Sequence, residues 1–353
     1  MEKQKLVPKN NGLIIPEDYC PILDRRETQV AVTEIKDFYD KQLARELNLK
    51  KIRGPLFLAA ETGINDDLTG AEKPVSFITP DINSDIEIVQ AVTKWKRMAL
   101  ADYGFKHGEG LFVDMHAIRS HEKLTSLHSI FVDQWDWERV ISREERTLAY
   151  LKEIVRRIYK VIKKTELYTY MNYRDITPIL PEKIKFIHSE ELLEKYPGTS
   201  AKQREDSACR EYGAVFIIGI GAELKDGKPH DVRAPDYDDW TTPTIRDYKG
   251  LNGDILVWHP ILKTALELTS MGIRVDKGIL EKQLIITSAE HKKDLLWHKR
   301  LLKGEFPLTI GGGIGQSRHF MFYLRKAHIG EVHCGIWPDW MRKVCEEKRI
   351  QLL

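Results

Sequence analysis

Apolar, strand-like segments follow one another along this sequence, mostly joined by polar connections without a regular helix between them. Residues 111–119 and 130–141 form the clearest pair, joined by the loop 120–129, and residues 75–79 and 86–92 form a second. Strands joined by short loops pair antiparallel, whereas parallel pairing needs a long crossover, usually a helix. We therefore expect a mixed α/β (α+β) chain with a central antiparallel sheet flanked by helices, and not a doubly wound dinucleotide fold.

Two long amphipathic helices are predicted beside these strands. The first covers 30–47, where apolar residues recur at mostly helical spacing. The second begins with Ser142 and Glu145, which form a capping box, S-x-x-E, and its apolar stripe runs from Leu148 to Ile162. Further strands are expected to begin at Pro55 and to cover 185–188, 215–220, 254–259 and 265–275.

Composition restricts the class of protein. The 353 residues are 42% hydrophobic, enough to build one large domain or two ordinary ones. Residues 1–28 are polar for the most part and are predicted to form an N-terminal arm. A net charge of +2 provides no electrostatic surface for a long polyanion, so we expect no nucleic acid partner. Basic groups that matter should instead act locally on a small anion.

The sequence gives no sign of export or of a metal cluster. The N-terminal residues lack the apolar core of a signal peptide, and the apolar run 213–222 is shorter than the ~20 residues that span a bilayer. The four cysteines lie far apart: Cys20, Cys209, Cys334 and Cys345. Their spacing fits a reducing cytoplasm. His116, His121 and His128 show no recognisable metal spacing and are interpreted as ordinary strand and loop residues.

Residues 310–318 read I-G-G-G-I-G-Q-S-R and are the most glycine-rich part of the chain. The dinucleotide pattern G-x-G-x-x-G, begun at Gly311, meets Gln316 where its third glycine belongs. A phosphate-binding P-loop would end in Gly-Lys-Ser/Thr, which this segment lacks. The loop predicted here therefore serves a different kind of nucleotide site, or none.

Polar and aromatic side chains alternate along 130–141. Gln134, Asp136 and Glu138 should share one face of a strand, because side chains two residues apart point the same way. Trp135 and Trp137 would pack on the other face and hold the polar row on a rigid platform. Such a row can bind a ligand that carries an amine.

Other charged groups point to a small, phosphate-bearing ligand. Arg119 ends the strand that faces the polar row, where its planar fork can reach a phosphate. Asp254 and Glu267 lie on consecutive predicted strands, and if they meet across the hairpin a cation such as Mg²⁺ would relieve their repulsion. Spacing alone makes it equally reasonable that they never meet. The acidic segment 230–240 carries Pro, Tyr and Trp and is interpreted as an ordered wall.

Together these segments resemble the catalytic domain of class II aminoacyl-tRNA synthetases and, more closely, the asparagine synthetase A family of ammonia-dependent aspartate–ammonia ligases. The resemblance spans about residues 57–337 and implies one catalytic domain over 29–353. The stretches that carry it are DDLTGAEKPV, KWKR, GEGLFVDMHAIR, LHSIFVDQWDWERV, FIHSEELLEKYP, GAVFIIGIG, HDVRAPDYDDW, LNGDILVW, ELTSMGIRVD and TIGGGIGQSR.

For ATP, the resemblance implies contacts from Arg119, Glu138, Asp254, Glu267, Gly311, Gly312, Gly313, Gly315 and Arg318. The glycine loop would close over a bent nucleotide. Arg119 would hold the α-phosphate, Arg318 the distal phosphates, and Glu138 would lie near the adenine. Asp254 and Glu267 would carry Mg²⁺.

For aspartate, the resemblance implies contacts from Asp66, Lys96, Gln134, Asp136, Asp238, Ser270 and Arg274. Asp66, Gln134 and Asp136 would receive the amino group, Arg274 the carboxylate that is not activated, and Lys96 the activated carboxylate. Only motif alignment favours Asp66 over the adjacent Asp67. One departure is Gln90-Ala91, where the family pattern leads us to expect His-Ser.

The implied reaction forms β-aspartyl-AMP and pyrophosphate, after which ammonia releases asparagine and AMP. Asp66, Lys96, Arg119 and Arg318 are its expected catalytic residues. The sequence does not choose which carboxylate takes the proton of ammonium. Glutamine-dependent enzymes use a cysteine at position 2, where this chain has Glu2, so free ammonia is the expected nitrogen source.

Two alternatives stay open at this level. One is an aspartyl- or asparaginyl-tRNA ligase, which would need an additional tRNA-binding module. The other is a synthetase-like regulatory subunit without catalysis, which should have lost its arginines and acids. The resemblance further implies a homodimer that pairs through residues 33–58.

Overall fold

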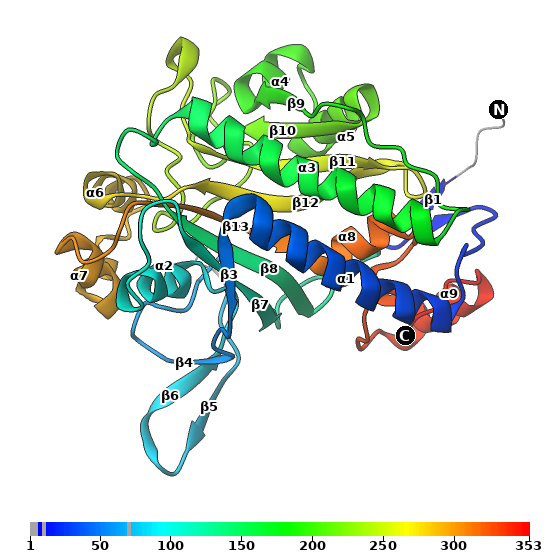
Figure 1. Cartoon of the computed structure of the whole chain (residues 1–353), viewed down its shortest axis with the longest axis horizontal. Helices are drawn as coiled ribbons and strands as arrows, with labels where there is room; N and C mark the ends of the chain where they lie inside the picture. The colour runs from blue at the N-terminus through cyan, green and yellow to red at the C-terminus, as the bar shows by residue number, and fades with distance from the viewer. Residues whose placement is uncertain (1–5, 9–11, 69–71) are drawn as a thin grey trace.

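A central sheet of eight strands organises the chain in the computed structural model, which describes residues 6–8, 12–68 and 72–353 (Figure 1). Its interior strands pair antiparallel, as predicted, and only the edge strands pair parallel to their neighbours. In spatial order the strands are β3 (Leu49–Ile52), β7 (Gly110–Ile118), β8 (Phe131–Val140), β13 (Thr309–Gly315), β12 (Thr264–Ile273), β11 (Asn252–His259), β10 (Ala214–Ile218) and β9 (Lys185–His188).

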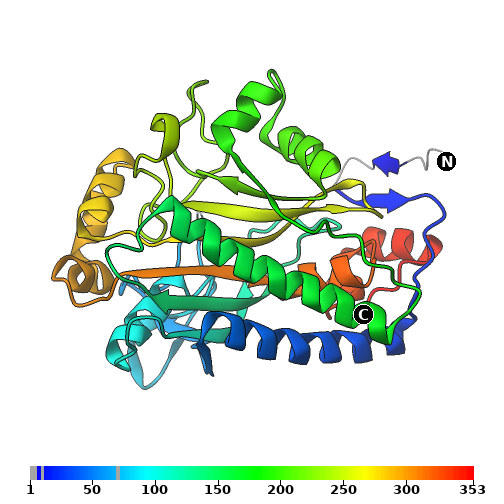
Figure 2. The ribbon, with the colours of Figure 1, turned by 45° about the horizontal axis from the view of Figure 1, so that its top comes forward.

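Helices cover one face of this sheet completely. The long helices α1 (Arg25–Leu47) and α3 (Leu148–Asn172) lie side by side across it, and α8 (Gln316–Tyr323) packs beneath them (Figures 1 and 2). The main hydrophobic core lies between these helices and the sheet, and it includes the fully buried Trp135 and Trp137 of β8. Large aromatic side chains contribute strongly to such a core because they bury so much apolar surface.

The opposite face is covered only toward its two ends. Near one end, α2 (Thr93–Asp102) packs on β7 and β8 through a second apolar cluster. Near the other, α5 (Ala201–Tyr212) packs on β10, β11 and β12 through a third cluster. Between α2 and α5, the polar side chains of the central strands face a space that neither helix fills.

Smaller elements complete the fold. A three-stranded sheet projects from the body (Figure 1). The remaining elements are β1 (Leu6–Pro8), β2 (Ile14–Pro16), β4 (Phe57–Ala59), β5 (Ser76–Thr79), β6 (Ile82–Ile88), α4 (Ser189–Lys195), α6 (Lys277–Ile286), α7 (Leu296–Leu302), α9 (Asp339–Glu347) and the short 3-10 turns at 245–247, 290–294 and 329–331. None of the helices in the described part of the chain combines the length and apolarity that a bilayer crossing requires.

Most of the predicted elements are present, but the predicted starts of both long helices are wrong. The helix predicted at 30–47 begins earlier, at Arg25, where Asp24 caps it and Glu27 completes a capping box. Helix α3 begins at Leu148 and not at Ser142, because Thr147 is its N-cap. Glu145 does accept the backbone N–H of Ser142 at 2.8 Å, but the Ser142 hydroxyl donates to Glu144 instead of closing the box.

The predicted N-terminal arm packs against the body over part of its length. Leu13, Ile15 and Tyr19 are buried in the main core, and the Tyr19 hydroxyl donates to Glu331 at 3.0 Å. The domain boundary at residue 28 stays a prediction.

The glycine-rich segment is a strand and not a loop, which corrects the sequence-based expectation. Residues 309–315 form β13 at the centre of the sheet, paired with β8 on one side and β12 on the other. A Cβ on Gly311 would collide with the carboxylate of Glu138, and one on Gly313 would lie 2.6 Å from Oε1 of Gln134. The glycines are therefore needed because side chains of β8 lean across β13 at this point.

Replacement of Gly312 by alanine should destabilise the protein. The new Cβ would lie 2.5 Å from the carbonyl oxygen of Ser270 and 2.6 Å from Cβ of Met271, both in the paired strand β12. Overpacking of this kind costs about 1–3 kcal/mol. Gly315→Ala is the matched control, since its nearest atom lies at 3.5 Å, and it should change stability by less than about 0.5 kcal/mol. Urea denaturation of both variants measures the difference, and equal midpoints would contradict this account.

Candidate active site

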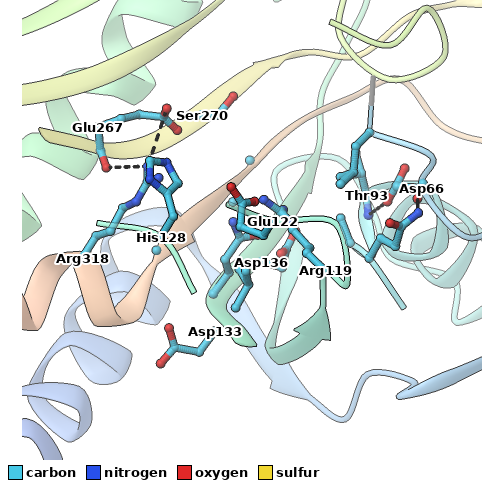
Figure 3. Close-up of a pocket in the computed structure, with 18 of the residues that line it drawn as sticks. Asp66, Thr93, Arg119, Glu122, His128, Asp133, Asp136, Glu267, Ser270 and Arg318 are labelled. Atoms are coloured by element: carbon cyan, nitrogen blue, oxygen red, sulfur yellow. Dashed lines mark hydrogen bonds and ion pairs between the residues drawn. The ribbon is translucent and has the colours of Figure 1, made fainter. Parts of the chain in front are cut away.

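A cavity of about 460 Å³ opens over the uncovered middle of the sheet. Its floor is formed by β8, β12 and β13, and its walls come from Asp66, Leu68 and Glu72 and from the segments around 119–133 and 231–238. Figure 3 shows Asp66 at one end, Arg318 and Glu267 at the other, and Arg119 and Asp136 between them. The site is therefore elongated, with chemically different ends.

The polar row predicted on β8 is present in the floor of the cavity. Gln134 and Asp136 line the cavity, while Trp135 and Trp137 are fully buried on the other side of the strand. Glu138 is fully buried and is not among the described residues that line the cavity. Its carboxylate lies against Gly311 of β13 and is occupied by Arg274, so the contact with adenine that the resemblance implies for it does not follow from this geometry.

Glu138 instead holds Arg274 in place. Nε of Arg274 lies 3.1 Å from each carboxylate oxygen of Glu138 and Nη2 lies 2.9 Å from one of them, while Nη1 donates to Asp238 at 2.5 Å. Burial alone would raise the pKa of Glu138, but the charges of Arg274 and Lys96 outweigh it and the pKa lies below its usual value. Arg274 and Asp238 both line the cavity, so a fixed guanidinium is available to a ligand carboxylate.

Lys96 supports the floor from α2, which packs on the same face of the sheet as the cavity. Its side chain is fully buried, and Nζ donates to the carboxylate of Asp136 and to the carbonyl oxygens of Trp137 (3.0 Å) and Gly312 (3.2 Å). Lys96 is not among the described residues that line the cavity. Oδ2 of Asp136 has no hydrogen-bond partner within the described chain and is left for a ligand. We therefore interpret Lys96 as the group that orients Asp136.

Asp66 presents one free oxygen at the far end of the cavity. Its Oδ2 accepts the backbone N–H of Thr93 at 2.7 Å, and Oδ1 is buried without a partner among the residues described. Burial raises the pKa of Asp66 to about 6, against the opposing charge of Lys94. Gln90, where the family pattern differs, lines the cavity and donates to the backbone oxygen of Asp66 at 3.1 Å.

The adjacent Asp67 is engaged elsewhere. Its carboxylate accepts from Nζ of Lys292 at 2.5 Å, and it is not among the described residues lining the cavity. The geometry therefore agrees with the motif alignment in favouring Asp66.

Arg318 lies at the opposite end of the cavity, and Arg119 lies between the two ends. Nη1 of Arg318 lies 3.2 Å from the backbone oxygen of Glu267 and 3.6 Å from its carboxylate (Figure 3). Nε of Arg119 has no partner in the described part of the chain, so its guanidinium can receive an anion. His128 also lines this end, and burial together with the charge of Arg318 lowers its pKa to about 4, so the imidazole is neutral.

Asp133 fixes the helix that carries Arg318. The N-cap of α8, Gly315, has no side chain to cap the helix. Asp133 on β8 does so from outside: it accepts the backbone N–H of Ser317 at 3.0 Å and the Ser317 hydroxyl at 2.7 Å, and Nδ1 of His333 lies 2.9 Å from the same hydroxyl. Sequence reasoning missed this residue, because the cap comes from a strand nearly two hundred positions away.

The two candidate metal-binding acids lie close enough to affect each other. Asp254 pairs in register with Ser270, and a β-bulge next to it shifts Glu267 along β12. Burial raises the pKa of Asp254 to about 7, with the charge of Glu267 adding to burial and Arg233 opposing both. Their carboxylate oxygens are ligands that Mg²⁺ accepts, and two carboxylates completed by phosphate oxygens make an ordinary magnesium site. The donor set thus fits the ion, although no group of three or more potential ligands occurs among the described residues.

Comparison with known proteins identifies the family. A family profile described as aspartate-ammonia ligase matches residues 26–349. The chain belongs to this family. It is 52% identical over 342 residues to the aspartate--ammonia ligase of Bacteroides thetaiotaomicron, covering 97% of this chain and 99% of that one. It is 54% identical over 344 residues to the enzyme of the same name from Clostridium perfringens, again covering 97% and 99%.

Solved structures confirm the fold of class II aminoacyl-tRNA synthetases. An asparaginyl-tRNA synthetase of Entamoeba histolytica in complex with asparaginyl-adenylate matches with a TM-score of 0.65 at 13% identity. The match covers 88% of this chain and 66% of that one, so the ligase spans just under two thirds of the synthetase. The Pyrococcus horikoshii asparaginyl-tRNA synthetase complexed with the same adenylate gives a TM-score of 0.65 at 14% identity, over 88% and 70% of the two chains.

Replacement of Lys96 by methionine should strongly destabilise the fold. Methionine fills the space but leaves the buried carboxylate of Asp136 without its cation, and breaking a buried pair in this way costs about 3–5 kcal/mol. Lys160→Met is the matched control, because Lys160 pairs with Glu46 at 3.0 Å on the surface, where such pairs contribute less than about 1 kcal/mol. Chemical denaturation compares the two variants. Equal losses would show that Lys96 does not act as a buried support.

Proposed function

We propose that the cavity binds aspartate at its Asp66 end and ATP at its Arg318 end, and that it joins ammonia to the β-carboxylate of aspartate. The observation that carries this assignment is the polarity of the elongated site. Carboxylates and a fixed Arg274 occupy one part, and unpaired or weakly paired arginines occupy the other. An amino acid needs the first set of groups and a polyphosphate needs the second.

The first step forms an acyl phosphate. A β-carboxylate oxygen of aspartate attacks the α-phosphorus of ATP, the bond to the β,γ-phosphates breaks, and pyrophosphate leaves with the electron pair. Arg119 lies midway along the cavity and would stabilise charge that develops on the α-phosphate, while Arg318 would hold the departing pyrophosphate. Both arginines already line the cavity in the ligand-free structure.

The substrate is held by groups that are already oriented. Arg274, fixed by Glu138 and Asp238, would bind the carboxylate that does not react. Oδ1 of Asp66 and Oδ2 of Asp136, both without partners among the described residues, would accept the ammonium group together with Gln134. Ser270 also lines the cavity and is retained as a pocket residue.

The second step requires ammonia without its extra proton. Ammonia attacks the acyl carbon of β-aspartyl-AMP, the C–O bond to phosphate breaks, and AMP leaves. A carboxylate with a pKa near neutrality can bind ammonium and take its proton, and Asp66 has the required environment. Asp66 is therefore our candidate for the base.

Magnesium belongs to the ATP end of the proposed site. Glu267 lines the cavity, whereas Asp254 is buried beside it and is not among the described residues that line it. The two would hold the ion, which when bound neutralises charge on the polyphosphate. Gly313 and Gly315 line the same cavity and leave room for the nucleotide over β13. The arginines and acids of the site are all present, as catalysis requires. A regulatory subunit without catalysis would be expected to have lost them.

Product analysis tests the function directly. The purified protein is incubated with aspartate, ATP and Mg²⁺, and with either ammonium or glutamine. Asparagine and AMP should form with ammonium alone. Exchange of pyrophosphate into ATP without asparagine would instead show adenylation with another acceptor, such as tRNA, and neither activity in a folded sample would refute the proposal.

Aspartate binding should depend on the protonation of Asp66. Because its pKa is raised to about 6, the carboxylate loses its charge as pH falls through that value, and the ammonium group of aspartate loses its partner. We expect affinity to fall about tenfold between pH ~7 and pH ~5, one pKa unit below the midpoint. Calorimetry measures this change.

Two variants separate Asp66 from its neighbour. Asp66→Asn should bind aspartate weakly and with little dependence on pH. Asp67→Asn should keep the wild-type pH profile, since Asp67 pairs with Lys292 away from the cavity. The opposite pattern would reassign the role to Asp67.

We further propose a homodimer in the cytoplasm. Leu56 and Phe57, within the expected pairing region 33–58, are nearly half exposed, at 45% and 49%, and would be covered by a second copy. The cysteines are free in the structure, in keeping with a reducing compartment. Sedimentation velocity measures the mass of the particle, and a monomer at micromolar concentration would contradict the dimer.

A further inference from the structure

Arg233 occupies the position where the proposed metal site would form. It belongs to the long connection 219–251 between β10 and β11, and its side chain points inward to line the cavity. Nη2 of Arg233 lies 2.5 and 2.7 Å from the two carboxylate oxygens of Asp254 and 2.9 Å from the hydroxyl of Ser270. Both oxygens that a metal ion would use on Asp254 are therefore engaged by a guanidinium.

The local charges explain why a cation is needed there. Asp254 is buried, Glu267 lines the cavity with a side chain that is 41% exposed, and Arg233 interacts electrostatically with both of them. Without a cation, the buried carboxylate of Asp254 would be repelled by Glu267 and would lose its hydration. The guanidinium supplies that positive charge from within the chain.

We propose that Arg233 is a placeholder for the divalent cation, which neutralises Asp254 in the ligand-free protein and releases it when magnesium arrives with the nucleotide. This inference rests on the proposed function, in which Asp254 and Glu267 hold the ion. It adds a residue that competes with the metal for the same carboxylate.

The side chain has room to move while its backbone stays fixed. A Cβ on Gly221 would lie 2.9 Å from Cβ of Arg233, so the chain is closely packed at that point. The guanidinium is held less completely: Nε has no partner among the residues described, and Nη1 lies 3.7 Å from the exposed carboxylate of Asp231. A rotation of the side chain can thus exchange Asp254 for Asp231 or for a phosphate in the cavity.

The placeholder couples metal binding to nucleotide binding. Without nucleotide, a metal ion must displace Arg233 and leaves the guanidinium without a strong partner. With nucleotide, the released guanidinium faces the cavity beside Arg119 and Arg318 and can interact with the phosphates. Metal affinity should therefore be low in the free protein and should rise when ATP is present.

Direct metal binding to the full-length protein tests the proposal. Mn²⁺ serves as the probe for Mg²⁺, and electron paramagnetic resonance measures free Mn²⁺ without ATP. Arg233→Gln removes the charge and should tighten Mn²⁺ binding by about 5- to 150-fold, the usual range for coupling between sites. Arg246→Gln is the matched control, because Arg246 lies on the same connection with a side chain that is 71% exposed, and it should bind like wild type.

Further variants separate the placeholder from the metal site itself. Asp254→Asn in the Arg233→Gln background should abolish the tight binding. If Asp254→Asn abolishes the Mn²⁺ binding of the wild-type protein while Arg233→Gln binds Mn²⁺ no better than wild type, the metal site stands and the placeholder is refuted. If Asp254→Asn has no effect on Mn²⁺ binding, the metal assignment in the proposed function fails, and the placeholder fails with it.

A conservative variant keeps the proposal testable if Arg233→Gln does not fold. Arg233→Lys keeps a positive charge, but its side chain is one bond shorter than the one whose single nitrogen, Nη2, contacts both oxygens of Asp254 and the Ser270 hydroxyl. Its Mn²⁺ affinity should therefore lie between wild type and Arg233→Gln. Thermal unfolding confirms that each variant is folded. Should Arg233→Gln fail to fold, a Lys variant with wild-type Mn²⁺ affinity would refute the proposal.

Discussion

The arrangement of the site depends on buried ion pairs. Their side chains reach across β13 at its glycine residues, where no side chain of β13 is in the way. Glu138 of β8 leans over Gly311 of β13 to reach Arg274 at the end of β12, and Lys96 reaches the same region from α2. Each charge is buried and is stabilised only by its partners, so none can be moved independently. Because these contacts fix side chains at the edge of the floor, the cavity presents oriented polar groups to a ligand.

Local sequence patterns predicted the sheet and the polar row well, because alternation along a strand has a direct physical cause. The row of Gln134 and Asp136 opposite Trp135 and Trp137 is present as expected. The glycine segment was assigned to a loop because glycine usually marks turns, and the reason for its strand geometry, the carboxylate of Glu138, comes from another strand.

Long-range partners were beyond the reach of the sequence. Asp133 caps α8, and Arg233 pairs with Asp254, but neither relation has a fixed spacing along the chain. Lys96 is predicted to contact the ligand; in the structure its Nζ binds Asp136, and it is not among the described residues that line the cavity. The side of α2 that faces the sheet depends on how the helix docks, which local sequence does not specify. The resemblance located the site, and only the three-dimensional structure separated residues that line it from residues that support it.

The open middle of the second sheet face has a consequence for stability. Between α2 and α5 the fold lacks the covering layer that its other face has, and the cavity floor carries polar groups with unsatisfied hydrogen-bonding capacity. A bound nucleotide would complete that layer much as a packed helix would. Since any ligand that binds only the native state raises its stability in proportion to the logarithm of its concentration, the substrates would act as part of the fold. The lifetime of the enzyme in a cell would then follow the supply of the molecules it consumes.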